Sequence, residues 1–266
     1  MATNQPEPLK TIQIEQLPVA VYASNQELGL AAALTARTII ASAIAARGAA
    51  NIILATGNSQ LTFLHALREL DGIEWSRVTV FHMDEYLGLD PSHPASFPLF
   101  LHRHILDQVQ PGKFYPVPSR PANVETACEE YEALLRAYPL DMVAMGIGEN
   151  GHIAFNDPPH AHFDEATWVK VIELAEASRR QQVGEGHFTS LAEVPTHAIT
   201  LTIPALLAPK RILCLVPEAR KAVAVRDCMT LPISEDRPAS ILRTVNHAQL
   251  YLDPDSAALL GDMGRG

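Results

Sequence analysis

Short apolar segments that alternate with helical stretches constrain the fold of this chain more than any other feature. Two examples are NIILA at residues 51–55 and VTVFH at 78–82. A strand with such a nearly continuous apolar run is buried on both sides, which is typical of a parallel sheet covered by helices. We therefore expect an α/β fold, a Rossmann-like sandwich whose mostly parallel sheet carries helices on both faces.

The order of the expected elements supports a single domain. Strands are predicted at residues 13–22, 51–55, 78–82, 141–145, 168–174, 198–203, 212–216 and 249–252. Helices are predicted at residues 25–48, 59–70, 95–109, 124–138, 176–183, 218–228 and 238–245. Without an internal repeat or a linker, residues 1–266 are expected to form one domain, with 1–10 and 254–266 as peripheral tails.

Composition and charge limit the partners and the location of the protein. Its 266 residues have a net charge of -10, which disfavours nucleic acid and anionic membranes as partners, because both need a basic face. An anionic substrate would need a local pocket of positive donors. Three distant cysteines, no signal peptide pattern and no run of about 20 apolar residues lead us to expect a cytoplasmic protein.

Ligands of such folds gather at the carboxyl ends of the strands, where the segment Thr56-Gly57-Asn58-Ser59 is found between a strand and a helix. Backbone N–H groups and the helix dipole at such a turn suit a phosphate group. An ordinary turn in which Ser59 caps the helix explains the segment equally well.

A second candidate site follows the strand at 78–82, where Asp84 and Glu85 are adjacent. Neighbouring side chains of a strand point to opposite faces, so we expect only one of them in the cleft. That carboxylate could act as a general base, although a solvated loop carboxylate is the alternative.

The third candidate is the segment GIGENGHIAFNDP at 146–158. Its glycine spacing resembles a dinucleotide-binding loop, but Pro158 would soon interrupt the helix that such glycines must open. Glycines such as Gly148 could instead let the backbone approach a small substrate. His152, beside Asn150 and near Asp157, fits a general acid–base group oriented by a partner; a structural histidine is the alternative.

Cations for an anionic substrate are offered by Arg179, Arg180 and Lys221, although a solvated helix face is the alternative for the arginines. The remaining histidines lack the usual zinc-binding spacings, so we expect no metal.

Taken together, these segments resemble the glucosamine-6-phosphate deaminase family, within a wider group that includes 6-phosphogluconolactonases. Similar segments occur in order along most of the chain: ATGNS, FHMDEYLGLDPSHPASFPLFLHRHIL, GIGENGHIAFNDP, VPTHAITLTIPALL and the region around Lys221. A lactonase is expected to have Asp-Glu-Arg and GHTASLF-like motifs, where this chain has Tyr86 and Ile153-Ala154-Phe155-Asn156. The deaminase branch is therefore favoured.

The resemblance implies conversion of glucosamine 6-phosphate and water to fructose 6-phosphate and ammonia, without a cofactor. It assigns the C2-to-C1 proton transfer to Asp84 and ring opening to His152, supported by Asn150 and Asp157. It also implies that Gly57, Asn58, Ser59 and Lys221 hold the phosphate. With the candidates from the sequence itself, the expected substrate-binding set is Thr56, Gly57, Asn58, Ser59, Glu85, Gly148, Arg179 and Lys221. A homo-oligomer is possible.

Three departures from the family pattern leave alternatives open. Asp157 replaces a glutamate, and the arginine expected before Phe188 has no clean match in 179–188. The basic residues of an allosteric site are not evident at 160–172, so we expect no activation by an amino sugar. The alternatives are another substrate such as galactosamine 6-phosphate, a 6-phosphogluconolactonase, or a non-catalytic sugar-phosphate sensor.

Overall fold

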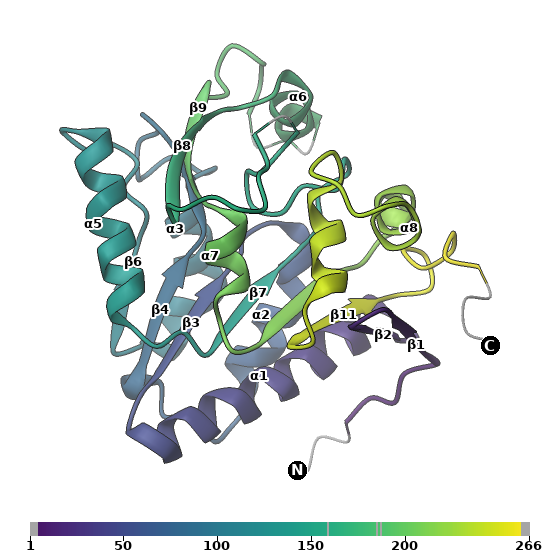
Figure 1. Ribbon diagram of the computed structural model, residues 1–266. Helices are drawn as coiled ribbons and strands as arrows, with labels where there is room; N and C mark the ends of the chain where they lie inside the picture. Colours follow the sequence, from purple (N-terminus) through teal and green to yellow (C-terminus); the bar gives the residue numbers. More distant parts are fainter. Residues whose placement is uncertain (1–4, 159, 185, 187, 262–266) are drawn as a thin grey trace.

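The computed structural model describes residues 5–158, 160–184, 186 and 188–261, and an eight-stranded sheet runs through its centre (Figure 1). The strand order is β1-β2-β11-β10-β7-β3-β4-β6. Neighbouring strands are parallel except for β1 and β2, which confirms the predicted α/β class. The strands are β1 (Lys10–Ile14), β2 (Leu17–Val21), β3 (Ala50–Leu54), β4 (Val78–His82), β6 (Lys113–Tyr115), β7 (Met142–Met145), β10 (Ile212–Val216) and β11 (Ala248–Leu252).

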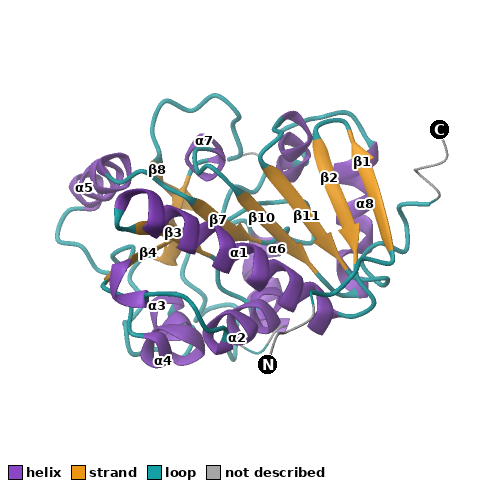
Figure 2. Cartoon of the chain, turned by 90° about the horizontal axis from the view of Figure 1, so that it is seen from below, coloured by secondary structure: helices purple, strands orange, loops and turns teal. Residues whose placement is uncertain are grey.

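Helices pack on both faces of this sheet because successive strand side chains are apolar on both sides (Figure 2). One face is covered by α1 (Asn25–Arg47), α2 (Leu61–Glu69) and the helical stretch of α3 (Phe97–Leu101) and α4 (Asp107–Val109). The other is covered by α5 (Val124–Ala137), α7 (Ile203–Leu207), α8 (Ala222–Thr230) and a 3₁₀ helix, Pro238–Thr244.

Helix α1 is long and apolar enough to cross a membrane by length and composition, with a mean hydropathy of 1.7. Half of that stretch is buried inside the fold, however, and the helix packs against α2, β3, β10 and β11. Ser24 caps its first turn by accepting a hydrogen bond from Glu27 N, and Gly48 ends it with a φ of 83°.

Some predicted elements differ from the structure. The strand expected at 13–22 is a hairpin of β1 and β2 that turns at Glu15, which has a φ of 51°. The helix expected at 95–109 begins at Phe97 and contains a π-helical segment, His102–Leu106. In the stretch 254–261, expected to be a peripheral tail, Ser256 and Leu260 are buried.

A second, antiparallel sheet was not predicted and lies above the carboxyl ends of the main strands, at the top of Figure 1. It consists of β5 (Asp84–Tyr86), β9 (His197–Leu201) and β8 (Val169–Glu173), with α6 (Glu176–Gly184) beside it. Tyr86 packs there against Phe97, Phe155 and Phe188 in a separate apolar cluster. This sheet positions Asp84, because β5 pairs with β9 over the end of β4.

Candidate active site

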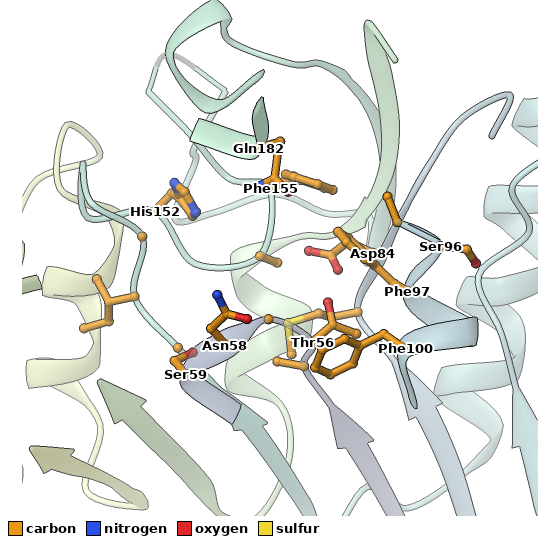
Figure 3. Close-up of a pocket in the computed structure, with 18 of the residues that line it drawn as sticks. Thr56, Asn58, Ser59, Asp84, Ser96, Phe97, Phe100, His152, Phe155 and Gln182 are labelled. Atoms are coloured by element: carbon orange, nitrogen blue, oxygen red, sulfur yellow. The ribbon is translucent and has the colours of Figure 1, made fainter. Parts of the chain in front are cut away.

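A cavity of about 150 Å³ lies between the carboxyl ends of the main strands and the small sheet (Figure 3). Its wall combines the turn after β3, the start of β5, the loop after β7 and the turn after β10. The polar side chains in the wall come from all of these segments, from the start of α3 and from α6: Thr56, Asn58, Ser59, Asp84, Ser96, His152, Gln182, Arg220 and Lys221.

The fold brings most of the proposed site residues to this one cavity. Eight of them line it: Thr56, Gly57, Asn58, Ser59, Asp84, Gly148, His152 and Lys221. Asn150 and Asp157 contact His152, whereas Glu85 and Arg179 make their contacts elsewhere.

The His152 ring is held by two side chains that act on the same nitrogen. Its Nδ1 lies 2.7 Å from Asn150 Oδ1 and 2.8 Å from Asp157 Oδ1. Because both partners are acceptors, Nδ1 carries a proton, and Nε2 of the neutral ring is left with its lone pair. Asn150 Nδ2 donates to Asp157 Oδ1 at 2.7 Å, which fixes the orientation of the amide.

Asp157 is held in its ionised form although it is buried. Burial by itself raises the pKa of this carboxyl. The charge that His152 carries when protonated and the hydrogen bonds from His152, Asn150 and Ser178 outweigh burial and lower the pKa to about 2. Ser178 of α6 donates to the second oxygen at 2.8 Å. Although its side chain is shorter than that of glutamate, Asp157 thus reaches His152 and connects it to α6.

Gly148 is required by the position of the His152 ring. A Cβ atom on Gly148 would overlap three atoms of that imidazole ring. The backbones are also joined, since Gly148 N donates to His152 O at 2.9 Å. The glycine therefore serves the close approach of a side chain rather than a dinucleotide.

Asp84 faces His152 from the opposite side of the cavity (Figure 3). Asp84 is only 7% exposed. Burial, and to a smaller extent the charge of Glu85, raises the pKa of its carboxyl to about 8. A carboxylate with such a pKa is a stronger base than an ordinary aspartate and can also return the proton that it accepts.

Glu85 points to α3 rather than into the cavity, and its expected role in substrate binding does not fit this position. Its carboxylate accepts hydrogen bonds from Phe97 N at 3.1 Å and Ser96 Oγ at 3.0 Å, which caps the start of α3. Burial raises its pKa to about 7 although these bonds act to lower it. Of the two adjacent side chains on β5, Asp84 thus lines the cavity and Glu85 contacts the start of α3.

Arg179, a proposed phosphate ligand, likewise has another role. Its guanidinium donates to the backbone oxygens of Leu191 and Val194 at 2.7 and 2.8 Å, closing the loop between α6 and β9. Arg220, Gln182 and the aromatic wall of Phe97, Phe100 and Phe155 also line the cavity and were not predicted from the sequence. The signal for Arg220 was its position directly before Lys221.

The turn after β3 supplies the polar floor of the cavity. Gly57 has a φ of 96°, which lets the chain turn directly into the 3₁₀ helix Asn58–Gln60. Ser59 Oγ accepts a hydrogen bond from Gln60 Nε2 at 3.1 Å, so its partner is a side chain rather than a helix N–H group. Among the described residues, no cluster of histidine, cysteine and carboxylate side chains could hold a metal ion.

A doubly wound α/β fold with an oriented histidine and a buried carboxylate at its strand ends defines an enzyme of acid–base chemistry. The family model described as "Glucosamine-6-phosphate isomerases/6-phosphogluconolactonase" matches residues 23–251, so the chain belongs to this family.

Individual relatives agree with this membership. The chain is 39% identical to a glucosamine-6-phosphate deaminase of Exiguobacterium sibiricum, over 79% of this chain and 81% of the relative. It is 34% identical to that of Bacillus pumilus, over 90% and 98% of the two chains. A solved monomeric glucosamine-6-phosphate deaminase superposes with a TM-score of 0.82 at 28% identity, covering 91% of this chain and 99% of the other. A 6-phosphogluconolactonase from Trypanosoma brucei, with a TM-score of 0.73 at 19% identity and 91% and 98% coverage, shares the fold.

Proposed function

We propose that this protein is a glucosamine-6-phosphate deaminase, which converts glucosamine 6-phosphate and water to fructose 6-phosphate and ammonia. The observation that carries the proposal is the pair of groups facing each other across the cavity. His152 is oriented by Asn150 and Asp157 on one side, and Asp84 is a buried base on the other.

His152 opens the sugar ring in this proposal. With the Nδ1 proton held by Asn150 and Asp157, Nε2 is free to take the proton of the C1 hydroxyl. It returns that proton to the ring oxygen as the C1–O5 bond breaks, which gives the open-chain aldehyde. The Asp157 carboxylate stabilises the imidazolium formed between these two transfers.

Asp84 then performs the isomerisation. It removes the proton from C2, which the adjacent aldehyde makes acidic, while a proton of the substrate's C2 ammonium group passes to O1, and the product is an enolamine. The proton taken from C2 is returned to C1, leaving an imine at C2. Water adds to that imine, ammonia leaves, and fructose 6-phosphate remains. The pKa of about 8 suits a group that must both accept and return a proton.

The phosphate group is bound, in the same proposal, by the turn Gly57–Ser59 and by Lys221. Lys221 is 6% exposed and lines the cavity, so its charge acts in surroundings with little water. The two segments follow β3 and β10 at the same edge of the sheet, and they give this acidic chain its local positive site.

The test is to incubate the purified protein with glucosamine 6-phosphate and to measure ammonia and fructose 6-phosphate together. We expect equal amounts of both products, and none with Asp84→Asn. The matched control is Asp90→Asn, six residues after Asp84. It removes an exposed carboxylate that is paired with Arg120, and it should leave the rate unchanged.

Parallel reactions with galactosamine 6-phosphate and 6-phosphogluconolactone identify the substrate. Turnover of the lactone without ammonia from either amino sugar would reject the deaminase. Faster turnover of galactosamine 6-phosphate would keep the reaction type and change the substrate. Full activity of Asp84→Asn would remove Asp84 from the role of the base.

A further inference from the structure

We propose that Arg220 is a second cation of the phosphate subsite and binds the substrate phosphate together with Lys221. This inference rests on the proposed function for the nature of the substrate, but its geometry does not depend on the reaction. Among the described residues lining the cavity, Arg220 and Lys221 are the lysine and arginine side chains.

Both cations lie on one short turn at the end of β10. The 3₁₀ helix Ala219–Lys221 follows that strand directly and begins after Glu218, which has a φ of 84°. Such a conformation is unfavourable for a non-glycine residue, so the surrounding structure must hold it in place. Glu218 N donates to Asp253 Oδ2 at 3.0 Å, which anchors the turn beside β11.

The other half of the subsite reaches the same place from β3. A Cβ atom on Gly146 would lie 3.0 Å from Ser59 Oγ and 3.4 Å from the backbone oxygen of Leu215 in β10. The turn with Asn58 and Ser59 therefore extends over β7 towards the end of β10. A phosphate group on this turn meets the segment that carries Arg220 and Lys221.

The interactions of Arg220 with its carboxylate neighbours are weak and do not prevent its guanidinium from also binding a phosphate. Its Nε lies 2.6 Å from Glu218 Oε2, and its Nη1 lies 3.4 Å from Glu149 Oε1. The three side chains are 32%, 38% and 45% exposed, and ion pairs at such exposure contribute little. The planar guanidinium can bind two phosphate oxygens through two parallel N–H groups held in one plane, whereas a lysine binds as a point charge.

Glu149 also connects this subsite to the acid–base group. It belongs to the loop in which Gly151 N donates to Gly148 O at 3.0 Å and which carries His152. Arg220 balances the Glu149 charge, which would otherwise repel a phosphate dianion in the cavity. The same side chain thus binds the phosphate and shields it from the carboxylate of the neighbouring loop.

The experiment measures two quantities in Arg220→Gln and Arg220→Lys: the Kd of inorganic phosphate by calorimetry, and the kinetics with glucosamine 6-phosphate. We expect Arg220→Gln to raise the phosphate Kd and the KM by about 10- to 100-fold, as for loss of a charge-assisted hydrogen bond, with a smaller change in kcat. Arg220→Lys keeps the charge but loses the bidentate geometry, so its phosphate Kd and KM should lie between those of the wild type and those of Arg220→Gln. Arg226→Gln is the control, since Arg226 is paired with Asp227 on α8.

The two readouts separate this inference from the proposed function. Phosphate binding that depends on Arg220 in a protein without deaminase activity would support the subsite and reject the function. Normal turnover with an unchanged phosphate Kd and KM in Arg220→Gln would reject the subsite and keep the function. An equal loss of phosphate affinity in Arg226→Gln would also reject it, because the effect would then be one of overall charge.

Discussion

The Asp157 carboxylate lies 2.8 Å from Nδ1 of His152, although its side chain is one methylene shorter than the glutamate of the family pattern. The contact is possible because Asp157 is fixed from behind by Ser178 of α6 and from the side by Asn150. The position of Asp157 therefore depends on α6, and so does the orientation of His152. This relationship makes a direct prediction about ring opening.

Asp157→Asn should lower kcat by on the order of 10²- to 10⁴-fold, because an amide neither fixes the Nδ1 proton nor stabilises the imidazolium. The measurement is steady-state deaminase kinetics, with the KM expected to change less than kcat. Ser178→Ala is the control for position alone, since it removes one hydrogen bond to the carboxylate and leaves its charge. A kcat of Asp157→Asn equal to that of Ser178→Ala would show that the charge of Asp157 has no part in the reaction.

The pH dependence of kcat/KM should report the raised pKa of Asp84. The base is active only when deprotonated, so the rate should rise with pH up to about 8, near the pKa of this group, rather than level off near 4. Burial is the main cause of the shift and the charge of Glu85 the second. Glu85→Gln should therefore move the acidic limb to lower pH. If the acidic limb does not move in Glu85→Gln, it reports the ionisation of the substrate or of another group.

Folding stability should also change with pH through Asp84. In the folded protein the Asp84 carboxyl keeps its proton up to about pH 8, whereas in the unfolded chain it releases the proton near pH 3.8. The folded state thus binds more protons between these values, and the stability contributed by the protonated group is full below pH 4 and is lost as the pH rises to 8. Asp84→Asn does not titrate, so its melting temperature relative to the wild type should increase between pH 4 and 8. Each kcal/mol corresponds to about 2–4 °C, and a constant difference across this range would contradict the raised pKa.

The sequence was sufficient for the parts of the fold that local pattern determines. Continuous apolar strands such as Ala50–Leu54 and Val78–His82 indicated the buried parallel sheet, and the glycine turn at 57 indicated where a ligand could bind. The strand Asp84–Tyr86 escaped prediction because it is three residues long. It is stabilised by pairing with His197–Leu201, more than a hundred residues later, and no local pattern encodes that pairing.

The roles of individual charged side chains depended on contacts that the sequence does not show. Alternation along a strand predicted that only one of Asp84 and Glu85 enters the cleft, but the partner of the other is set by where α3 begins. Arg179 resembled a charge on a solvated helix face, and Arg220 was not predicted to belong to the site. One closes a loop through backbone oxygens and the other lines the cavity, and only the packing of α6 and the turn after β10 distinguishes them.

The last prediction concerns the space that Gly148 leaves for His152. Gly148→Ala should displace the ring, because the added methyl group would occupy the position of its atoms. A displacement of about 1 Å at a reacting group can lower the rate by on the order of 10²-fold, and we expect a loss of this size in kcat/KM with the fold intact. Gly184→Ala is the matched control, since a Cβ atom there meets nothing within 4 Å. The readouts are the deaminase rate and the melting temperature of both variants. Full activity of Gly148→Ala would mean that opening of the sugar ring tolerates movement of His152. The position of the imidazole would then no longer explain why residue 148 is a glycine.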